Sequence, residues 1–199
     1  MALKFAVNNS LSAITSLPSG ISGGALNLIS TQTASASASL EFSLDDSYDS
    51  YIFKFYNIHP STNSYTQFQC TTDGTNYNTT ITSTVFSGYH DEADSFAILQ
   101  YFTSGDQAQG TSFQNLNETD NVGTDNDMSM SGSLTLYNPS STTFVKHFLA
   151  NTNSVGVQPL SANVYTAGYF NTTNSITGIK FQQSSGNIDD GIIKMYGVS

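Results

Sequence analysis

The sequence has 199 residues and contains one cysteine, Cys70, no tryptophan and few charges. A single cysteine excludes both an intrachain disulfide and a Cys-x-x-Cys metal site. Lys and Arg together number 5 against 15 Asp and Glu, which gives a formal net charge of −10. Nucleic acids and anionic membranes both attract basic surfaces, so we expect neither of them as a partner.

Long apolar runs are missing as well. The N-terminal stretch MALKFAV is much shorter than the apolar core of a signal peptide. No apolar run approaches the roughly 20 residues that a membrane-spanning helix needs. We therefore expect synthesis in a reducing cytoplasm, with no signal peptide and no export.

Neutral polar residues are abundant, whereas charged residues are few. Ser, Thr and Asn account for 72 residues, whereas charged residues make up only 10% of the chain. Aromatic residues make up 12%, which is enough apolar material for a core and differs from the composition of a disordered chain. The length fits one sizeable domain.

Short segments with an apolar–polar period of two run through most of the chain, and turn residues separate them about every ten residues. No segment has the pattern of an amphipathic helix. We therefore predict an all-β antiparallel sandwich or barrel of roughly eight to ten strands. The predicted domain spans residues 34–199, and residues 1–33 form an N-terminal arm or edge strands. The expected strands lie mainly at residues 34–44, 51–58, 65–72, 77–86, 133–139, 142–152, 176–182 and 191–198, and residues 95–102 are expected to form a strand or one short helix.

Two stretches carry more detailed predictions. In residues 34–44, every second residue from Ala34 to Leu44 is apolar, including Ala36 and Ala38, which predicts one half-buried strand. The stretch GNIDDG, residues 186–191, lies between two strand patterns and is rich in turn-forming residues. We interpret its two aspartates as part of a hairpin turn rather than as a catalytic pair. Asp73-Gly74 is a second turn signal of the hairpin type.

Candidate sites for chemistry are weak. Asp120, Asp125 and Asp127 could offer oxygen ligands to calcium, but their spacing differs from that of an EF-hand loop, and we interpret them as a solvated loop. His90-Asp91-Glu92 is also interpreted as a loop.

No GxSxG elbow, P-loop or dinucleotide-binding motif occurs. We predict no catalytic, cofactor-binding or metal-binding residue, and no cofactor. Tyrosines in strands, such as Tyr51, Tyr56 and Tyr137, are interpreted as half-buried packing.

The N-terminal 40 residues contain one charge, Lys4, together with Pro18 and several glycines. A neutral apolar surface of this kind promotes association unless it is buried. We predict that much of residues 1–30 packs against another protein chain. The proposed assembly interface consists of Leu11, Ile14, Leu17, Ile21, Leu26 and Leu28.

Four blocks of sequence resemble a family of virion structural proteins from tailed bacteriophages of marine bacteria. They are LSAITSLPSGISGGALNLISTQTASASAS, YDSYIFKFYNIHP, SGSLTLYNPSSTTFVKHF and SSGNIDDGIIKMYGV, and the resemblance covers essentially the whole chain. It implies a β-sandwich of jelly-roll type, many copies in each particle and no enzymatic activity. It supplies no catalytic or metal-binding motif.

We therefore expect a non-enzymatic virion protein that assembles with copies of itself, as a trimer, and with other virion proteins. Its expected place is the capsid, as a decoration, cement or head-fibre protein. The first alternative is a tail or fibre component that binds host surface glycans. A hydrolase of jelly-roll fold is a third interpretation, although the sequence lacks a recognisable pair of carboxylates or a metal motif for it.

Overall fold

A computed structural model describes residues 26–199, which form two antiparallel β-sheets and no membrane-spanning helix in that range. The short apolar–polar alternations seen in the sequence become strands, and turns or bends separate them. The strands are β1 (Asn27–Thr33), β2 (Leu40–Ser43), β3 (Ser50–Pro60), β4 (Thr66–Thr71), β5 (Ile81–Asp91), β6 (Ala97–Tyr101), β7 (Ala108–Gly110), β8 (Gln114–Asn115), β9 (Met130–Tyr137), β10 (Lys146–Val155), β11 (Leu160–Phe170), β12 (Gly178–Gln183) and β13 (Ile188–Val198).

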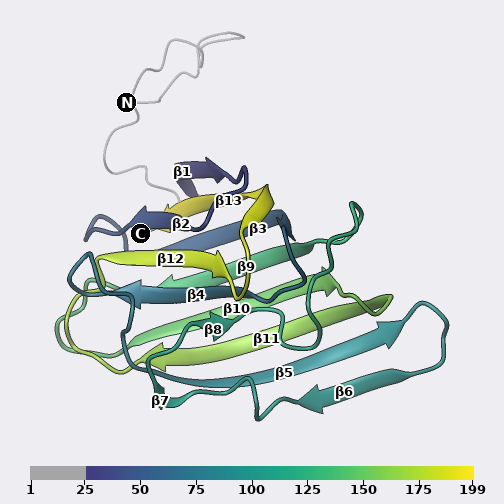
Figure 1. Cartoon of the computed structure of the whole chain (residues 1–199). Helices are drawn as coiled ribbons and strands as arrows, with labels where there is room; N and C mark the ends of the chain where they lie inside the picture. Colours follow the sequence, from purple (N-terminus) through teal and green to yellow (C-terminus); the bar gives the residue numbers. More distant parts are fainter. Residues whose placement is uncertain (1–25) are drawn as a thin grey trace, which may run out of the picture.

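The two sheets form a sandwich. The larger sheet has the order β1-β13-β3-β9-β10-β11-β5-β6, with β7 as a further partner of β5, and the smaller sheet has the order β2-β12-β4-β8. Figure 1 shows the smaller sheet in front of the larger one, while β1 and β6 lie at opposite edges of the larger sheet. The predicted antiparallel β-sandwich is confirmed, and the arrangement is consistent with a sandwich of jelly-roll type.

Phenylalanine rings fill the space between the two sheets. The ring centroid of Phe181, in β12, lies 5.2 Å from that of Phe55 and 5.3 Å from that of Phe53, both in β3. Phe68, in β4, lies 5.1 Å from Phe148, in β10, with the rings nearly perpendicular. These pairs join the small sheet to the large one, and such edge-to-face contacts add about 0.5–1.5 kcal/mol each beyond simple burial.

Strand β10 shows how the sequence pattern becomes a two-faced strand. Phe148 and Ala150 point into the core, whereas His147 and Leu149 are exposed on the other side. The strand begins at Lys146, so the predicted range 142–152 starts too early. Lys146 itself is fully buried, and its Nζ donates a hydrogen bond to the carbonyl oxygen of Thr172 at 3.0 Å.

The predicted single strand over residues 34–44 is wrong in its first half. Ala34 is buried, but Ala36 and Ala38 are exposed, and the chain bends between β1 and β2. Ala36 has a positive φ of 49°, which no extended strand allows. Alternating small residues predicted an inward face here, but after Thr33 the backbone follows β13 only irregularly, up to an isolated bridge at Ser37, and it enters the small sheet at Leu40.

The hairpin predicted around GNIDDG is also wrong. β12 pairs with β2 and β4 in the small sheet, whereas β13 pairs with β1 and β3 in the large sheet. The turn at residues 184–187 is therefore a crossover between sheets, and Asp189 and Asp190 belong to β13. The pairing of β13 with β3 shifts register on both sides of Asp190, so the two aspartates lie in an irregular, bulged part of the ladder.

Asp73-Gly74 likewise makes a turn without a hairpin. Gly74 has a positive φ of 78°, and Asp73 accepts hydrogen bonds from the backbone N–H groups of Thr75 and Asn76, both at 2.8 Å. The strands on either side, β4 and β5, lie in different sheets. The predicted turn is present, but the connection it makes is again a crossover.

Candidate functional site

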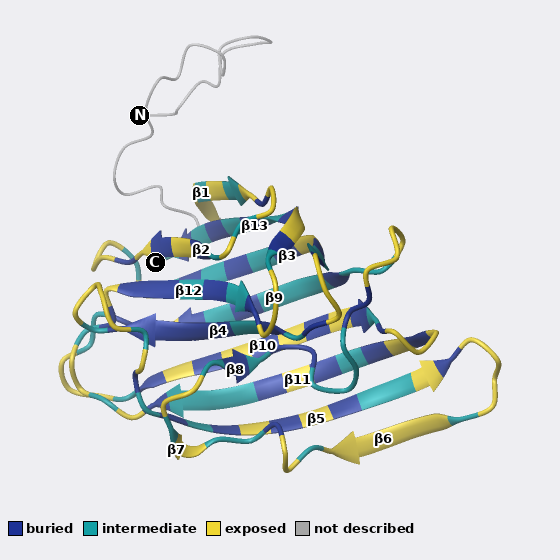
Figure 2. Ribbon diagram, in the orientation of Figure 1, coloured by how far each residue is buried: buried dark blue, intermediate teal, exposed yellow. Residues whose placement is uncertain are grey.

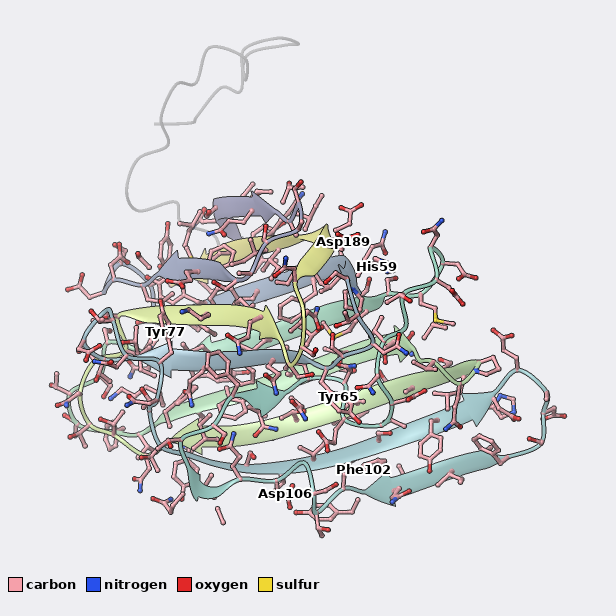
Figure 3. All side chains as sticks on the ribbon, in the orientation of Figure 1. His59, Tyr65, Tyr77, Phe102, Asp106 and Asp189 are labelled. Atoms are coloured by element: carbon pink, nitrogen blue, oxygen red, sulfur yellow. The ribbon has the colours of Figure 1, made fainter. Side chains whose placement is uncertain are left out.

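An acidic hollow of about 520 Å³ lies where β3, β13 and the loop before β9 meet. Its lining includes His59, Asp127, Asp189 and Asp190. The Nδ1 atom of His59 lies 2.7 Å from the carbonyl oxygen of Met128 and donates to it, which fixes the ring. Figure 3 shows His59 and Asp189 near each other at this end of the sandwich. The bulge in β13 places its two carboxylates at the hollow.

The hollow lacks the arrangement that metal binding requires. Within residues 26–199, no group of three or more His, Cys, Asp or Glu side chains could hold a metal ion. One Asp190 oxygen already accepts a hydrogen bond from the Gly191 N–H at 2.6 Å. Of the three aspartates considered for calcium, Asp120 accepts from the Gln158 N–H at 2.8 Å, and Asp125 and Asp127 are exposed.

The His90-Asp91-Glu92 cluster shapes a turn. Asp91 accepts hydrogen bonds from the N–H groups of Ser95 and Phe96 at 2.9 and 3.1 Å, and also from the Ser95 hydroxyl. The Ser95 hydroxyl is the main reason that the pKa of the Asp91 carboxyl is lowered. His90 Nε2 contacts Asp94 at 3.0 Å on the exposed surface. These contacts hold the turn between β5 and β6, so the cluster has a structural role.

The proposed assembly residues divide between the described part of the chain and the rest. Leu11, Ile14, Leu17 and Ile21 lie outside the described residues. Leu26 is 43% exposed, and Leu28, in the edge strand β1, is 56% exposed. Ile29 is exposed beside them, so the described end of the proposed interface presents apolar side chains to solvent.

The opposite edge of the large sheet carries a second exposed apolar strand. β6 has the sequence AILQY, and all five of its residues are exposed. Leu99 is 78% exposed, and Figure 2 shows the strand exposed along its whole length. β6 pairs with β5 alone, so its outer backbone groups have no strand partner in residues 26–199. The sequence predicted a strand or short helix here, but not its place at an edge.

The outer face of the large sheet is partly apolar too. Phe86 in β5 and Tyr165 in β11 are directly opposite each other, and their rings stack at 5.0 Å with an angle of 10°. A hollow of about 380 Å³ lies beside this stack, with Tyr137 and Leu149 among its lining residues. Tyr137 and Tyr165 are both 40% exposed.

The lining of this hollow has a distinctive chemistry. It combines aromatic and aliphatic groups with the hydroxyls and amide of Ser133, Thr135 and Asn151, and it includes no charged residue. A second hollow of about 270 Å³ shares Leu149 and Ala167 with the first, so the depression continues along β10 and β11. Such a surface is suited to binding rather than to proton transfer.

The three strand tyrosines interpreted as half-buried packing differ in their burial. Tyr51 is buried, and its hydroxyl donates to the Asp45 carboxylate at 2.5 Å. Tyr56 and Tyr137, by contrast, are both 40% exposed on the outer face. Tyr165 and Tyr169 were not among the predicted site residues. The alternation in β11 could have identified them as outward-facing, because they have the parity opposite to the buried residues.

Comparison with family models, with curated proteins and with solved structures finds no match to this chain.

Proposed function

We propose that this chain is a non-enzymatic structural protein of a bacteriophage particle. It is carried on the capsid as a decoration, cement or head-fibre protein, and it acts through protein–protein assembly. Its partners are copies of itself, as a trimer, and other particle proteins. The four sequence blocks that resemble virion proteins support the phage assignment.

The observation that carries the assembly role is the pair of exposed apolar edges. β1 presents Leu28 and Ile29 at one edge of the large sheet, and β6 presents Leu99 and Tyr101 at the other. An exposed apolar edge strand is a template for pairing with another chain, and monomeric proteins usually protect it with charges, proline or a covering segment. Neither strand contains a charged residue or proline.

The positions of the two edges are compatible with a closed ring. A contact between β1 of one copy and β6 of the next would join two different surfaces, which makes it a head-to-tail contact. Head-to-tail contacts close into rings when the rotation between copies allows it. A trimer is a small ring of this kind, and it leaves no apolar edge exposed.

The mass of the purified protein in solution tests this proposal. We expect a mass near three times the chain mass of 21.3 kDa. Leu28→Lys and Leu99→Lys place a charge at each edge and should each shift the protein towards monomer. Phe144→Lys is the matched control, because Phe144 is 68% exposed but lies in the loop between β9 and β10.

The control should keep the mass of the wild type. A monomeric wild-type protein, or edge variants that assemble as well as the wild type, would contradict assembly through the edges. Cryo-electron microscopy of an intact particle would then test the proposed position on the capsid, because a decoration protein must appear on the outer shell in many copies.

The alternative role, a tail or fibre component that binds host surface glycans, has one observation in its favour. The outer face of the large sheet carries the stacked rings of Phe86 and Tyr165 beside a depression lined by hydroxyls and an amide. Binding of the isolated protein to host cells would support this role, and it would distinguish a receptor-binding protein from one that only assembles.

A further inference from the structure

Two lysines lie side by side on the outer face of the large sheet. Lys54 in β3 and Lys194 in β13 are directly opposite each other in the strand register. The Nζ of Lys54 lies 5.8 Å from the ring centre of Tyr196, and the Nζ of Lys194 lies 5.5 Å from that of Tyr56. The two aromatic rings therefore flank a pair of neighbouring positive charges.

This pair is unusual in so acidic a chain. Residues 26–199 contain two other lysines, of which Lys180 pairs with Glu41 at 2.8 Å and Lys146 is buried. No carboxylate of the described residues forms an ion pair with Lys54 or Lys194. Like charges directly opposite in a sheet are destabilising, so a bound anion would relieve a repulsion that the protein alone leaves in place.

The strand register connects the lysines to the aromatic depression. One row across the outer face runs from Lys54 to Ser133, then to Asn151 and to Tyr165. Neighbouring strands are about 4.8 Å apart, so Lys54 and Tyr165 are roughly 14 Å apart across the sheet. This distance suits a short stretch of oligosaccharide, with its acidic group at the lysines and a ring against the aromatic side chain.

We propose that this outer face is a binding site for an anionic polysaccharide, bearing carboxylate or sulfate groups, that lies along the row from Lys194 to Phe86. Hydroxyl-rich sugar rings present apolar CH faces to Tyr165 and polar groups to Ser133 and Asn151, whose side chains both donate and accept hydrogen bonds. An acidic protein segment would use the lysines but has no need of this alternation of aromatic rings, hydroxyls and an amide. The inference deepens the glycan-binding role and does not depend on assembly through the edges.

Binding to immobilised polymers tests the proposal. Alginate supplies carboxylates, dextran sulfate supplies sulfates, dextran is the neutral control and polyglutamate represents an acidic protein. We expect the full chain to bind alginate, dextran sulfate or both, and not dextran, with an affinity that falls as salt rises. The Lys54→Gln/Lys194→Gln double variant and Tyr165→Ala should each weaken binding by about tenfold or more.

Two controls distinguish a site from general charge effects. Lys180→Gln removes a lysine that also lies over a tyrosine ring, 4.2 Å from the centre of Tyr77, but on the small sheet, so it should leave binding unchanged. The Lys54→Arg/Lys194→Arg variant keeps both charges and should still bind. All variants should keep the oligomeric mass of the wild type, because none of the substituted residues belongs to the edge strands β1 and β6.

Three results would overturn the proposal. The first is a wild-type protein that binds neither anionic polymer. The second is a double lysine variant that binds as tightly as the wild type. The third is binding to polyglutamate that equals binding to the polysaccharides and is unaffected by Tyr165→Ala, which would make an acidic protein segment the ligand.

Discussion

Cys70 shows how far the local pattern of one strand determines the state of a single side chain. It has the same parity as Phe68 in β4, and both side chains are fully buried in the core. The surrounding core raises the pKa of the thiol, because burial disfavours the charged thiolate. Parity alone does not explain the burial of the preceding residue, Gln69, which has the opposite parity and is also buried. The Gln69 side-chain amide donates hydrogen bonds to the carbonyl oxygens of Thr111 and Ser112.

The buried thiol leads to a first prediction. Cys70 should react slowly with a thiol reagent in the native protein and quickly in urea, because the thiolate is the reactive form and native burial suppresses it. Cys70→Ser should lower the free energy of unfolding by about 1 to 3 kcal/mol, the cost of burying a hydroxyl without a good partner. Rapid labelling of the native protein would show that the core around β4 opens easily.

Lys146 leads to a second prediction, on pH. Burial lowers the pKa of its amine below the ordinary value of 10.5, so the folded state loses this proton at lower pH than the unfolded state. The unfolded state binds more protons between the two pKa values, so this lysine's contribution to stability increases as pH rises through that window. The increase amounts to at most about 1.4 kcal/mol for each pH unit.

The check is a comparison of the wild type with Lys146→Met by urea unfolding at several alkaline pH values. Tyrosines titrate in the same range, so the informative quantity is the difference in stability between the two proteins. We expect the free energy of unfolding of the wild type, relative to that of the variant, to increase as pH rises through the window. A difference that stays constant with pH would show that the amine keeps its ordinary pKa in the folded protein.

At the scale of the strand, the bulge in β13 is where the structure differs most from the hairpin predicted for GNIDDG. Gly191 has a φ of 122°, and a Cβ atom there would meet the Asn57 carbonyl oxygen at 2.7 Å and the Ile58 Cα at 2.8 Å. The glycine is therefore needed for both its backbone conformation and its lack of a side chain. The neighbouring Asp189 is exposed and has no such constraint.

A third prediction separates these two requirements. Gly191→Ala should cost about 1 to 3 kcal/mol of stability through strain and the clash with β3. Gly74→Ala is the matched control, because Gly74 also has a positive φ but no other atom lies within 4 Å of the place that a Cβ would take, so it should cost less. Asp189→Ala should cost about 1 kcal/mol or less. Equal losses at both glycines in thermal unfolding would argue against a close approach of β13 to β3.

The strands could be predicted because the alternation of apolar and polar residues is a local property of the sequence. The pairing of strands into sheets could not be predicted, because it joins residues far apart in the chain. The pattern in residues 51–58 is enough to place β3, but nothing in it indicates that β3 lies between β13 and β9. Both hairpin predictions failed for this reason, since turn residues show that the chain reverses but not which sheet it enters. The aromatic depression depends on the same long-range information, because Phe86 and Tyr165 meet only once β5 and β11 are paired.

At the scale of the whole molecule, apolar surface is unevenly distributed over the large sheet. One face is covered by the small sheet, while the other face and both edges expose aromatic and aliphatic side chains. Figure 2 shows the contrast between the buried strands β12 and β4 and the exposed strand β6. A neutral surface of hydroxyls and amides is little affected by salt, whereas ion pairs weaken as salt screens them. These properties suit a protein that works in contact with other chains at variable salt.

The last prediction concerns the N-terminal residues. Strand β1 begins at Asn27 and pairs with β13, so a deletion of residues 2–25 removes no residue of the described strands, whereas a deletion of residues 2–33 also removes an edge strand. We expect the shorter deletion to give a folded protein with the β-sheet circular dichroism and melting temperature of the full chain, but with weaker assembly, since the edge strands β1 and β6 remain, and with lost particle incorporation. The reason is that residues 1–25 carry one charge, Lys4, and burying roughly 400 Å² of apolar surface there would contribute about 10 kcal/mol before the costs of association. The longer deletion should melt at a lower temperature, because it exposes β13. If the chain without residues 2–25 failed to fold, those residues would belong to the core of the sandwich, and the assembly role predicted for Leu11, Ile14, Leu17 and Ile21 would be wrong.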